Sequence, residues 1–223
     1  MSREKIITGI DIGSTKISTV VASVSDNKVS VIGVSGNVPS KGINKGNVVD
    51  IDSAVEVISQ SIEKAERMAG ISVSDAFVTI NGSHIETLNS HGVVAVAPNE
   101  NADITREDVA RVIEAAQAVS LPSTREIIHV IPRDFVVNSQ EGIKDPVGMS
   151  GVRLEVETNV IHGSATAMKN IVKCVNKIAI DVDELVYSGL ASAEAVLTDT
   201  ERELGTLLVD IGGGTTSIIA FLD

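Results

Sequence analysis

Two short stretches of the chain repeat one pattern of residue types that suits phosphate binding. The first reads TGIDIGSTKISTVV over residues 8–21, and the second reads LVDIGGGTTSIIAF over residues 208–221. In each, an apolar run reaches an Asp (Asp11 or Asp210), a turn of glycines and hydroxyl residues follows, and a second β-type run continues. Glycine turns let backbone N–H groups approach an anion closely, and hydroxyl groups add further donors. Two such turns could therefore hold a polyphosphate from both sides.

The Asp of each turn adds a possible role in cation binding. A carboxylate at a strand end can hold a hydrated Mg²⁺ against phosphate oxygens. Because a buried, unpaired carboxylate is costly, we expect a cation or a hydrogen-bond donor beside Asp11 and Asp210. A P-loop or a dinucleotide fingerprint would lead into a helix, whereas TTSIIAF after the second turn has the composition of a strand. One such turn alone is most often a structural hairpin, but the matched pair favours phosphate binding.

Composition restricts the function classes. The chain has 223 residues, enough for one large domain or two to three small ones. Its formal net charge of −12 disfavours nucleic acid and anionic lipid as partners of the bulk surface, and three Phe, one Tyr and no Trp leave few base-stacking groups. The single Cys174 cannot form an internal disulfide, which fits a reducing compartment. We find neither a signal peptide nor a run of the ~18–20 apolar residues that a membrane span needs.

The hydrophobic pattern predicts alternating strands and helices. In the first part we expect strands over 5–12, 17–24 and 28–36 with a turn at Asp26-Asn27, a connection over 40–49, a helix over 51–69 that stops at Gly70, and a strand over 76–82. Later we expect a strand over 88–98, a helix over 104–119 capped by Thr105 and Asp108, strands over 125–138 and 151–163, a helix over 164–180, a strand over 183–189 and a helix over 190–199. The pattern predicts an α/β fold with a β-β-β-α-β lobe and an inserted β-α-β-β module.

At these residues the sequence resembles the actin-like ATPase superfamily, which includes actin, sugar kinases and DnaK-type chaperones. Within it the resemblance narrows to FtsA, the bacterial cell-division actin homologue. It is carried by KGINKGNVVDIDSAVEVISQSIEKAERMAG, INGSHIETLNSHGVVAV, HVIPRDFVVNSQEGIKDPVGMSGVRLEVETNVI and LASAEAVLTDTERELGTLLVDIGGGTTSIIAF, which cover nearly the whole chain. It implies an actin-like (ribonuclease H-like) lobe over 1–82 plus 163–198, an FtsA-type inserted subdomain over 83–162, and the start of a second lobe over 199–223.

The resemblance also implies a role for each matched site residue. The first phosphate loop would consist of Asp11, Gly13, Ser14, Thr15 and Lys16, and the second of Asp210, Gly212, Gly213, Gly214, Thr215 and Thr216. Lys16 would contact phosphate as a point charge, although it could also be a solvated turn lysine. Asp11 and Asp210 would bind Mg²⁺ through water. Glu194 would lie near the attacking water, with Asp210 as the other candidate catalytic residue, although Glu194 could equally be an exposed helix residue.

Two positions depart from the family pattern. Ser217 stands where the family has Asp after the two Thr residues, and we expect this side chain to face away from the phosphates. Ser188-Gly189 stands where many relatives have Glu-Pro, just before the helix expected over 190–199, which resembles the connecting helix that links the two lobes in this family.

The resemblance implies an ATP- and Mg²⁺-binding protein that polymerises, binds FtsZ and recruits later division proteins. It would tether the FtsZ ring to the cytoplasmic face of the membrane, with at most weak ATPase activity, so its status as an enzyme stays open. The family's chain is longer and reaches the membrane through a C-terminal amphipathic helix, so we expect this chain to be an N-terminal fragment. The alternatives are a pilus-assembly ATPase relative and a chaperone- or kinase-type phosphoryl-transfer enzyme. The inserted module and the connecting helix favour FtsA.

Overall fold

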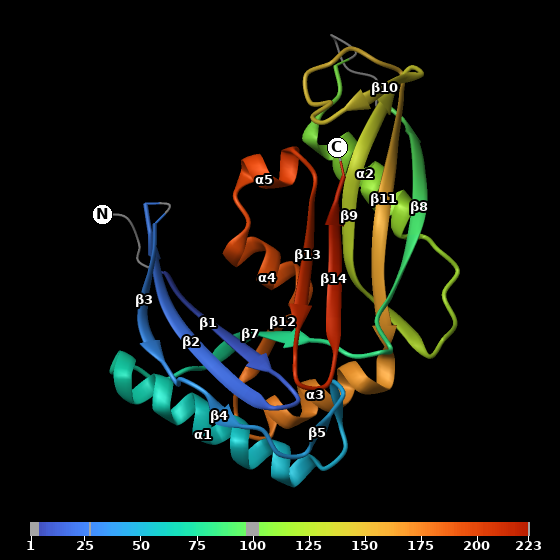
Figure 1. The fold of residues 1–223 in the computed structure, drawn as a ribbon. Helices are drawn as coiled ribbons and strands as arrows, with labels where there is room; N and C mark the ends of the chain where they lie inside the picture. Colours follow the sequence, from blue (N-terminus) through green and yellow to red (C-terminus); the bar gives the residue numbers. More distant parts are fainter. Residues whose placement is uncertain (1–4, 27, 97–102, 223) are drawn as a thin grey trace. The chain divides into compact units, whose positions relative to one another are not determined.

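The computed structural model describes residues 5–26, 28–96 and 103–222 of the chain. Asn27, and Ala97 and Pro98 at the end of the strand expected over 88–98, lie outside these residues. The chain divides into two compact units, unit 1 (Met1–His84 and Ala165–Asp223) and unit 2 (Ile85–Ser164). Unit 1 contains residues 199–223, and their assignment to a second lobe stays a prediction. Figure 1 shows the elements of both units.

A mixed sheet forms the centre of unit 1. Its main strands follow the order β12-β7-β1-β2-β3. They are β1 (Lys5–Ile12), β2 (Lys16–Ser25), β3 (Lys28–Val34), β7 (Asp75–Ile80) and β12 (Asp181–Tyr187). Strand β2 pairs antiparallel with β1 and with β3, whereas β7 runs parallel to both β1 and β12. The expected connection over 40–49 contains a small hairpin of β5 (Ile43–Asn44) and β6 (Asn47–Val48), and β4 (Val38–Pro39) pairs with β2.

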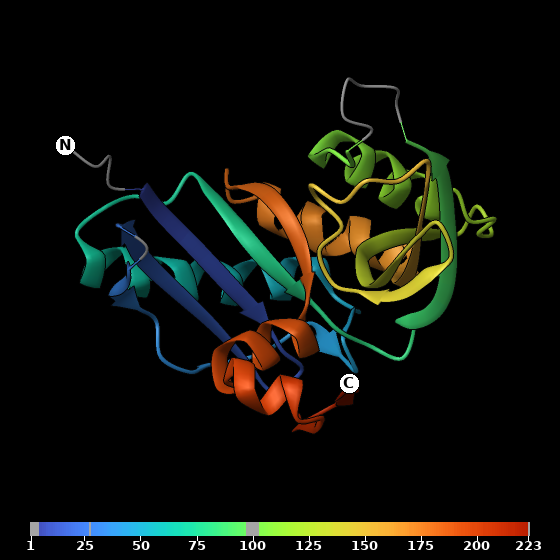
Figure 2. The ribbon, with the colours of Figure 1, turned by 90° about the horizontal axis from the view of Figure 1, so that it is seen from above.

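Helices lie on both faces of this sheet. Helix α1 (Ile51–Ala69) begins where the Asp50 side chain accepts hydrogen bonds from two backbone N–H groups, and it ends at Gly70, whose φ is 71°. In Figures 1 and 2, α1 and α3 (Ala165–Asn176) lie on one face, and α4 (Ser188–Val196) lies on the other. Alternate residues of a strand point to opposite faces, so β1 and β7 can supply both a core and a site.

The end of the described chain forms a second hairpin in unit 1. Strands β13 (Thr206–Ile211) and β14 (Thr216–Phe221) pair as an antiparallel two-stranded sheet, and α5 (Asp199–Glu203) precedes them. The expected strand over 183–189 ends earlier than its pattern indicated. Ser188 and Gly189 belong to α4, because the helical backbone begins directly after Tyr187.

Unit 2 is an antiparallel sheet with one covering helix. Its strands follow the order β10-β9-β11-β8, and β10 lies between the strands expected over 125–138 and 151–163, where no strand was expected. The elements are β8 (Glu86–Ala95), α2 (Arg106–Gln117), β9 (Arg125–Val137), β10 (Gln140–Ile143) and β11 (Arg153–Ser164). Helix α2 packs closely, since a Cβ on Gly92 would lie 2.3 Å from the Val112 carbonyl oxygen. The predicted Thr105–Asp108 capping box is confirmed.

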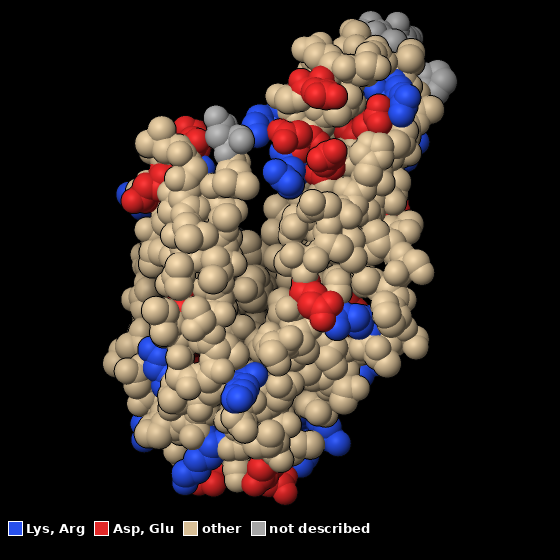
Figure 3. Space-filling model, turned by 45° about the vertical axis from the view of Figure 1, so that its right-hand side comes forward, with Lys and Arg blue, Asp and Glu red and all other residues tan. Residues whose placement is uncertain are grey.

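Two further properties are the distribution of charge on one face and the hydrophobicity of the helices. On the face drawn in Figure 3, acidic and basic side chains are interspersed between wide areas of uncharged residues. In the part of the chain that the structure describes, no helix combines the length and apolar character that crossing a bilayer requires.

Candidate phosphate-binding site

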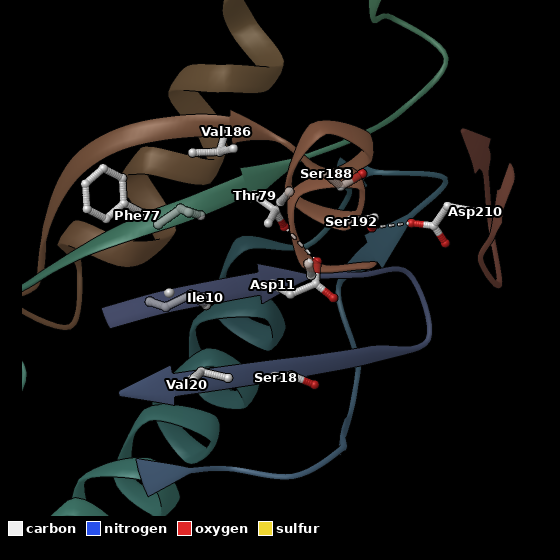
Figure 4. A pocket seen from close by; sticks show the side chains of 14 residues that line it. Ile10, Asp11, Ser18, Val20, Phe77, Thr79, Val186, Ser188, Ser192 and Asp210 are labelled. Atoms are coloured by element: carbon white, nitrogen blue, oxygen red, sulfur yellow. Dashed lines mark hydrogen bonds between the residues drawn. The ribbon is translucent and has the colours of Figure 1, made fainter. Parts of the chain in front are cut away.

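Asp11 and Asp210 line the same cavity in unit 1. The cavity has a volume of about 460 Å³ and lies between the α4 face of the sheet and α4 itself (Figure 4). Thr79 Oγ1 donates to Asp11 Oδ1 at 2.7 Å, and Ser192 Oγ donates to Asp210 Oδ2 at 2.9 Å. Each carboxylate therefore has the hydrogen-bond donor that a partly buried acid requires.

The two repeated sequences form the same turn. The N–H of Gly13 donates to the Lys16 carbonyl at 3.0 Å, and that of Gly212 donates to the Thr215 carbonyl at 2.9 Å. A Cβ would lie 2.7 Å from the same carbonyl oxygen at Gly13 and 3.0 Å from it at Gly212. Each turn therefore needs a glycine at its first position for its own closure, independently of any ligand.

The tips of the two turns touch each other. A Cβ on Gly213 would lie 2.3 Å from Thr15 Cγ2, and one on Gly214 would lie 2.5 Å from Ser14 Oγ. The second and third glycines of the GGG run thus leave room for the hydroxyl side chains of the first turn. A phosphate can lie between these points only if the turns part, whereas the cavity beside them already reaches both Asp side chains.

The turn between β5 and β6 lies against both repeated turns, and the sequence did not identify it. The N–H of Gly46 donates to Ser14 Oγ at 3.1 Å, and Lys45 Cα lies 3.1 Å from the position that a Cβ on Gly214 would take. Lys45 and Gly46 both have positive φ, of 48° and 78°, as a tight two-residue hairpin requires. The NKGN sequence was the available signal, and it was assigned only to a connection.

Asn81, directly after β7, also contacts the second repeated turn, and the sequence did not identify it as a site residue. Its Nδ2 donates to Thr215 Oγ1 at 2.9 Å, and its Oδ1 accepts from the Gly82 N–H at 2.7 Å. Ser217 Oγ also donates to Asn81 Oδ1, at 3.3 Å. Ser217 is therefore a buried contact to the end of β7.

The remaining residues of the predicted site lie at its margin. Lys16 and Thr216 are exposed, each as the first residue of the strand that leaves its turn. Glu194 is exposed and does not line the cavity. Arg202 donates to Glu194 Oε1 at 2.7 Å, and this hydrogen bond raises the pKa of the guanidinium. The roles expected for these three residues stay predictions.

The donor set around the cavity fits a hydrated cation. Within residues 5–26, 28–96 and 103–222, no three His, Cys, Asp or Glu side chains gather closely enough to hold a metal ion directly. Two carboxylates face the cavity instead, together with hydroxyl groups. Ser188 also lines the cavity, and its hydroxyl is buried without a hydrogen-bond partner in the described structure. In proteins, Mg²⁺ usually keeps several of its water molecules and is bound through one or two carboxylates together with phosphate groups.

Comparison with known proteins shows which family the sequence resembles. Residues 82–162 match the family described as "SHS2 domain inserted in FTSA". The chain is 45% identical over 220 residues to the cell division protein FtsA of Pseudomonas aeruginosa, an alignment covering 98% of this chain and 52% of that protein. The chain is similar to FtsA along almost its whole length. FtsA of Bacillus subtilis is 42% identical over 221 residues, with coverage of 99% and 50%. The resemblance to FtsA is confirmed, and the chain spans about half the length of these relatives.

A solved structure supports the fold. The chain aligns with a "PilM-PilN type IV pilus biogenesis complex" structure at a TM-score of 0.63 and 17% identity, with coverage of 96% of this chain and 57% of that one. At this identity the likeness shows the fold alone. It confirms the expected α/β actin-like class. The FtsA-like sequence thus occurs on a fold that a pilus protein shares, which is why fold alone does not choose between the two functions.

Proposed function

We propose that the protein acts in bacterial cell division as an FtsA-type actin-like protein that binds ATP with Mg²⁺. The observation that carries the proposal is the meeting of the two repeated turns, whose Asp11 and Asp210 carboxylates line one cavity. Relatives named cell division protein FtsA, with 40–45% identity to this chain in four different bacteria, support the cellular role.

The phosphate groups would bind to the two turns. Ser14, Thr15, Thr215 and Thr216 would contribute hydroxyl donors, the glycine backbones would contribute N–H donors, and exposed Lys16 would turn toward the anion. Because the turn tips touch, we expect ATP to separate the β13–β14 hairpin from the first turn as it binds. A ligand can drive such a change only through its preference for the parted state.

Magnesium would neutralise charge on the phosphates. Asp11 and Asp210 would hold its water shell, while Thr79 and Ser192 keep the two carboxylates oriented by donating hydrogen bonds to them. If hydrolysis occurs, we expect it to be slow, with Asp210 and Glu194 as the candidate catalytic residues. Glu194 would first have to leave Arg202.

The partners proposed here are FtsZ, later division proteins and further copies of the same chain. We also propose a location on the cytoplasmic face of the membrane, with attachment through the C-terminal helix that the resemblance to FtsA implies. We expect no nucleic-acid partner, because the net charge of −12 opposes binding to a polyanion.

Titration of Mg-ATP tests the proposal. In the full-length protein that contains residues 1–223, Asp210→Ala should abolish the binding of Mg-ATP measured by calorimetry, because it removes one of the two carboxylates at the cavity. Asp183→Asn is the matched control, since Asp183 is an exposed carboxylate of β12 that does not line the cavity. Unchanged ATP affinity in Asp210→Ala would remove the proposed site. Division in cells that carry only this variant should fail while the control divides normally.

One alternative keeps a specific observation in its favour. The fold shared with a PilM–PilN complex structure allows a role in pilus assembly. The SHS2 match over residues 82–162 favours division instead. Complementation of an FtsA-depleted strain separates the two roles.

A further inference from the structure

The Asn81 side chain determines what the Thr215 hydroxyl can do. A threonine hydroxyl has one hydrogen to donate and can also accept hydrogen bonds. Thr215 Oγ1 accepts from Asn81 Nδ2 at 2.9 Å, so its own hydrogen points elsewhere. Thr215 is therefore presented as a donor, which is what a phosphate oxygen requires because that oxygen only accepts.

The orientation of the Asn81 amide is fixed by a second contact. The backbone N–H of Gly82 can only donate, and it lies 2.7 Å from Asn81 Oδ1. Ser217 Oγ, buried in β14, donates to the same oxygen at 3.3 Å. Both contacts keep the oxygen of the amide on their side, and the NH₂ group must then face Thr215.

The surroundings hold Asn81 in place. A Cβ on Gly46 would lie 2.3 Å from the backbone carbonyl oxygen of Asn81, so the β5–β6 turn packs directly on this residue. Asn81 also directly follows β7, which pairs with β1 and β12 inside the sheet. The amide thus directly follows a strand inside the sheet. Thr215 must keep its contact with Asn81 while the glycines at the tip of the hairpin part from the first turn.

We propose that Asn81 is a positioning residue for the second phosphate turn. It directs the Thr215 hydroxyl hydrogen toward a phosphate oxygen, and with Ser217 it holds the β13–β14 hairpin at the end of β7. This inference rests on the proposed binding of ATP at the two turns. Ser217 differs from the Asp of the family pattern, and the structure assigns it the role of a second donor to Asn81.

A double-mutant cycle in the full-length protein that contains residues 1–223 tests the inference. Asn81→Asp keeps the shape of the side chain but replaces the NH₂ donor with an acceptor, which would capture the Thr215 hydrogen. We expect Mg-ATP to bind roughly 10- to 100-fold more weakly, as for loss of one hydrogen bond to a charged group. In a Thr215→Val background, the same change should weaken binding by less than about threefold, because no hydroxyl remains to be misdirected.

The outcomes separate this inference from the proposed function. If Asn81→Asp weakens binding equally in both backgrounds, its effect comes from charge or folding, and the positioning role is wrong. If Thr215→Val alone leaves ATP affinity unchanged, the Thr215 hydroxyl donates to no phosphate and the positioning role is wrong, whereas the phosphate site itself is tested separately by Asp210→Ala. Circular dichroism checks that each variant folds. Should Asn81→Asp fail to fold, Asn81→Ala replaces it in the cycle, with the same coupling to Thr215 expected and equal losses in both backgrounds again overturning the proposal.

Discussion

Gly213→Ala tests the contact between the two turns, on which the site depends. The added Cβ would lie 2.3 Å from Cγ2, 2.6 Å from Oγ1 and 3.0 Å from Cβ of Thr15. Carbon atoms pack well at about 3.5–4.0 Å, so the overlap exceeds roughly 1 Å. Rotation about χ1 of Thr15 cannot remove it, since the Thr15 Cβ is itself too close. The hairpin must therefore shift or leave its place on the first turn.

The size of the effect follows from comparison with Gly9→Ala. Neither glycine has a positive φ, so alanine fits both backbones, and each change should gain about 0.4–1 kcal/mol by restricting the unfolded chain. At Gly9 the new Cβ meets nothing within 4 Å, so Gly9→Ala should be neutral or stabilising. At Gly213, overpacking should cost about 1–3 kcal/mol in addition. Gly213→Ala should therefore be less stable than Gly9→Ala by about 1–3 kcal/mol, or by the docking free energy of the hairpin if that is smaller.

Two measurements follow the change. Urea unfolding monitored by far-ultraviolet circular dichroism gives the free energy, because the chain has no Trp for fluorescence. Hydrogen exchange of the β13 and β14 amides reports docking of the hairpin directly, and these amides should exchange faster in Gly213→Ala. Adding Thr15→Ala removes both γ atoms and should restore part of the protection. If Gly213→Ala and Gly9→Ala match in both measurements, the two turns are not in contact in solution.

Two further predictions concern pH. Hydrogen bonds from the Ser53 hydroxyl and from backbone N–H groups lower the pKa of Asp50, so its stabilisation of α1 is present above a pH of about 4 and is lost as the pH falls through the lowered pKa. Asp50→Ala should thus lower the thermal midpoint at pH 7, whereas Asp50→Asn should keep a capping acceptor but remove this pH dependence. Burial and the Arg125 guanidinium lower the pKa of His162, whose Nδ1 accepts from Arg125 Nε at 2.8 Å. Because the unfolded chain then binds the proton more readily, stability should fall as the pH drops below about 6.5, and a urea midpoint in His162→Gln that varies with pH as in the parent would contradict this.

Local patterns in the sequence determined the regular elements and the form of the two turns. The helix over 51–69 was predicted with its observed bounds from its apolar spacing and the stop at Gly70. In the structure, the side-chain cap at Asp50 and the left-handed Gly70 fix these bounds within one turn of the chain. The repeated turns were predicted for a similar reason. Each closes over four residues, as the bonds from Gly13 and Gly212 show, so its sequence is sufficient to specify it. Short pieces such as β5, β6 and β10 were missed, because strands of two to four residues carry too little periodicity.

Tertiary structure alone decided which residues complete the site. Asn81 contacts Thr215 across 134 positions of sequence, and no local pattern marks either residue as a partner of the other. Likewise, the reason that Gly213 must be glycine lies in the side chain of Thr15, which only folding brings near. The role that the resemblance implies for Glu194 stays a prediction, but its contact with Arg202, eight residues away, was not visible in the sequence. Sequence specifies what forms within a few residues, whereas contacts between distant segments depend on how the sheet and its helices pack.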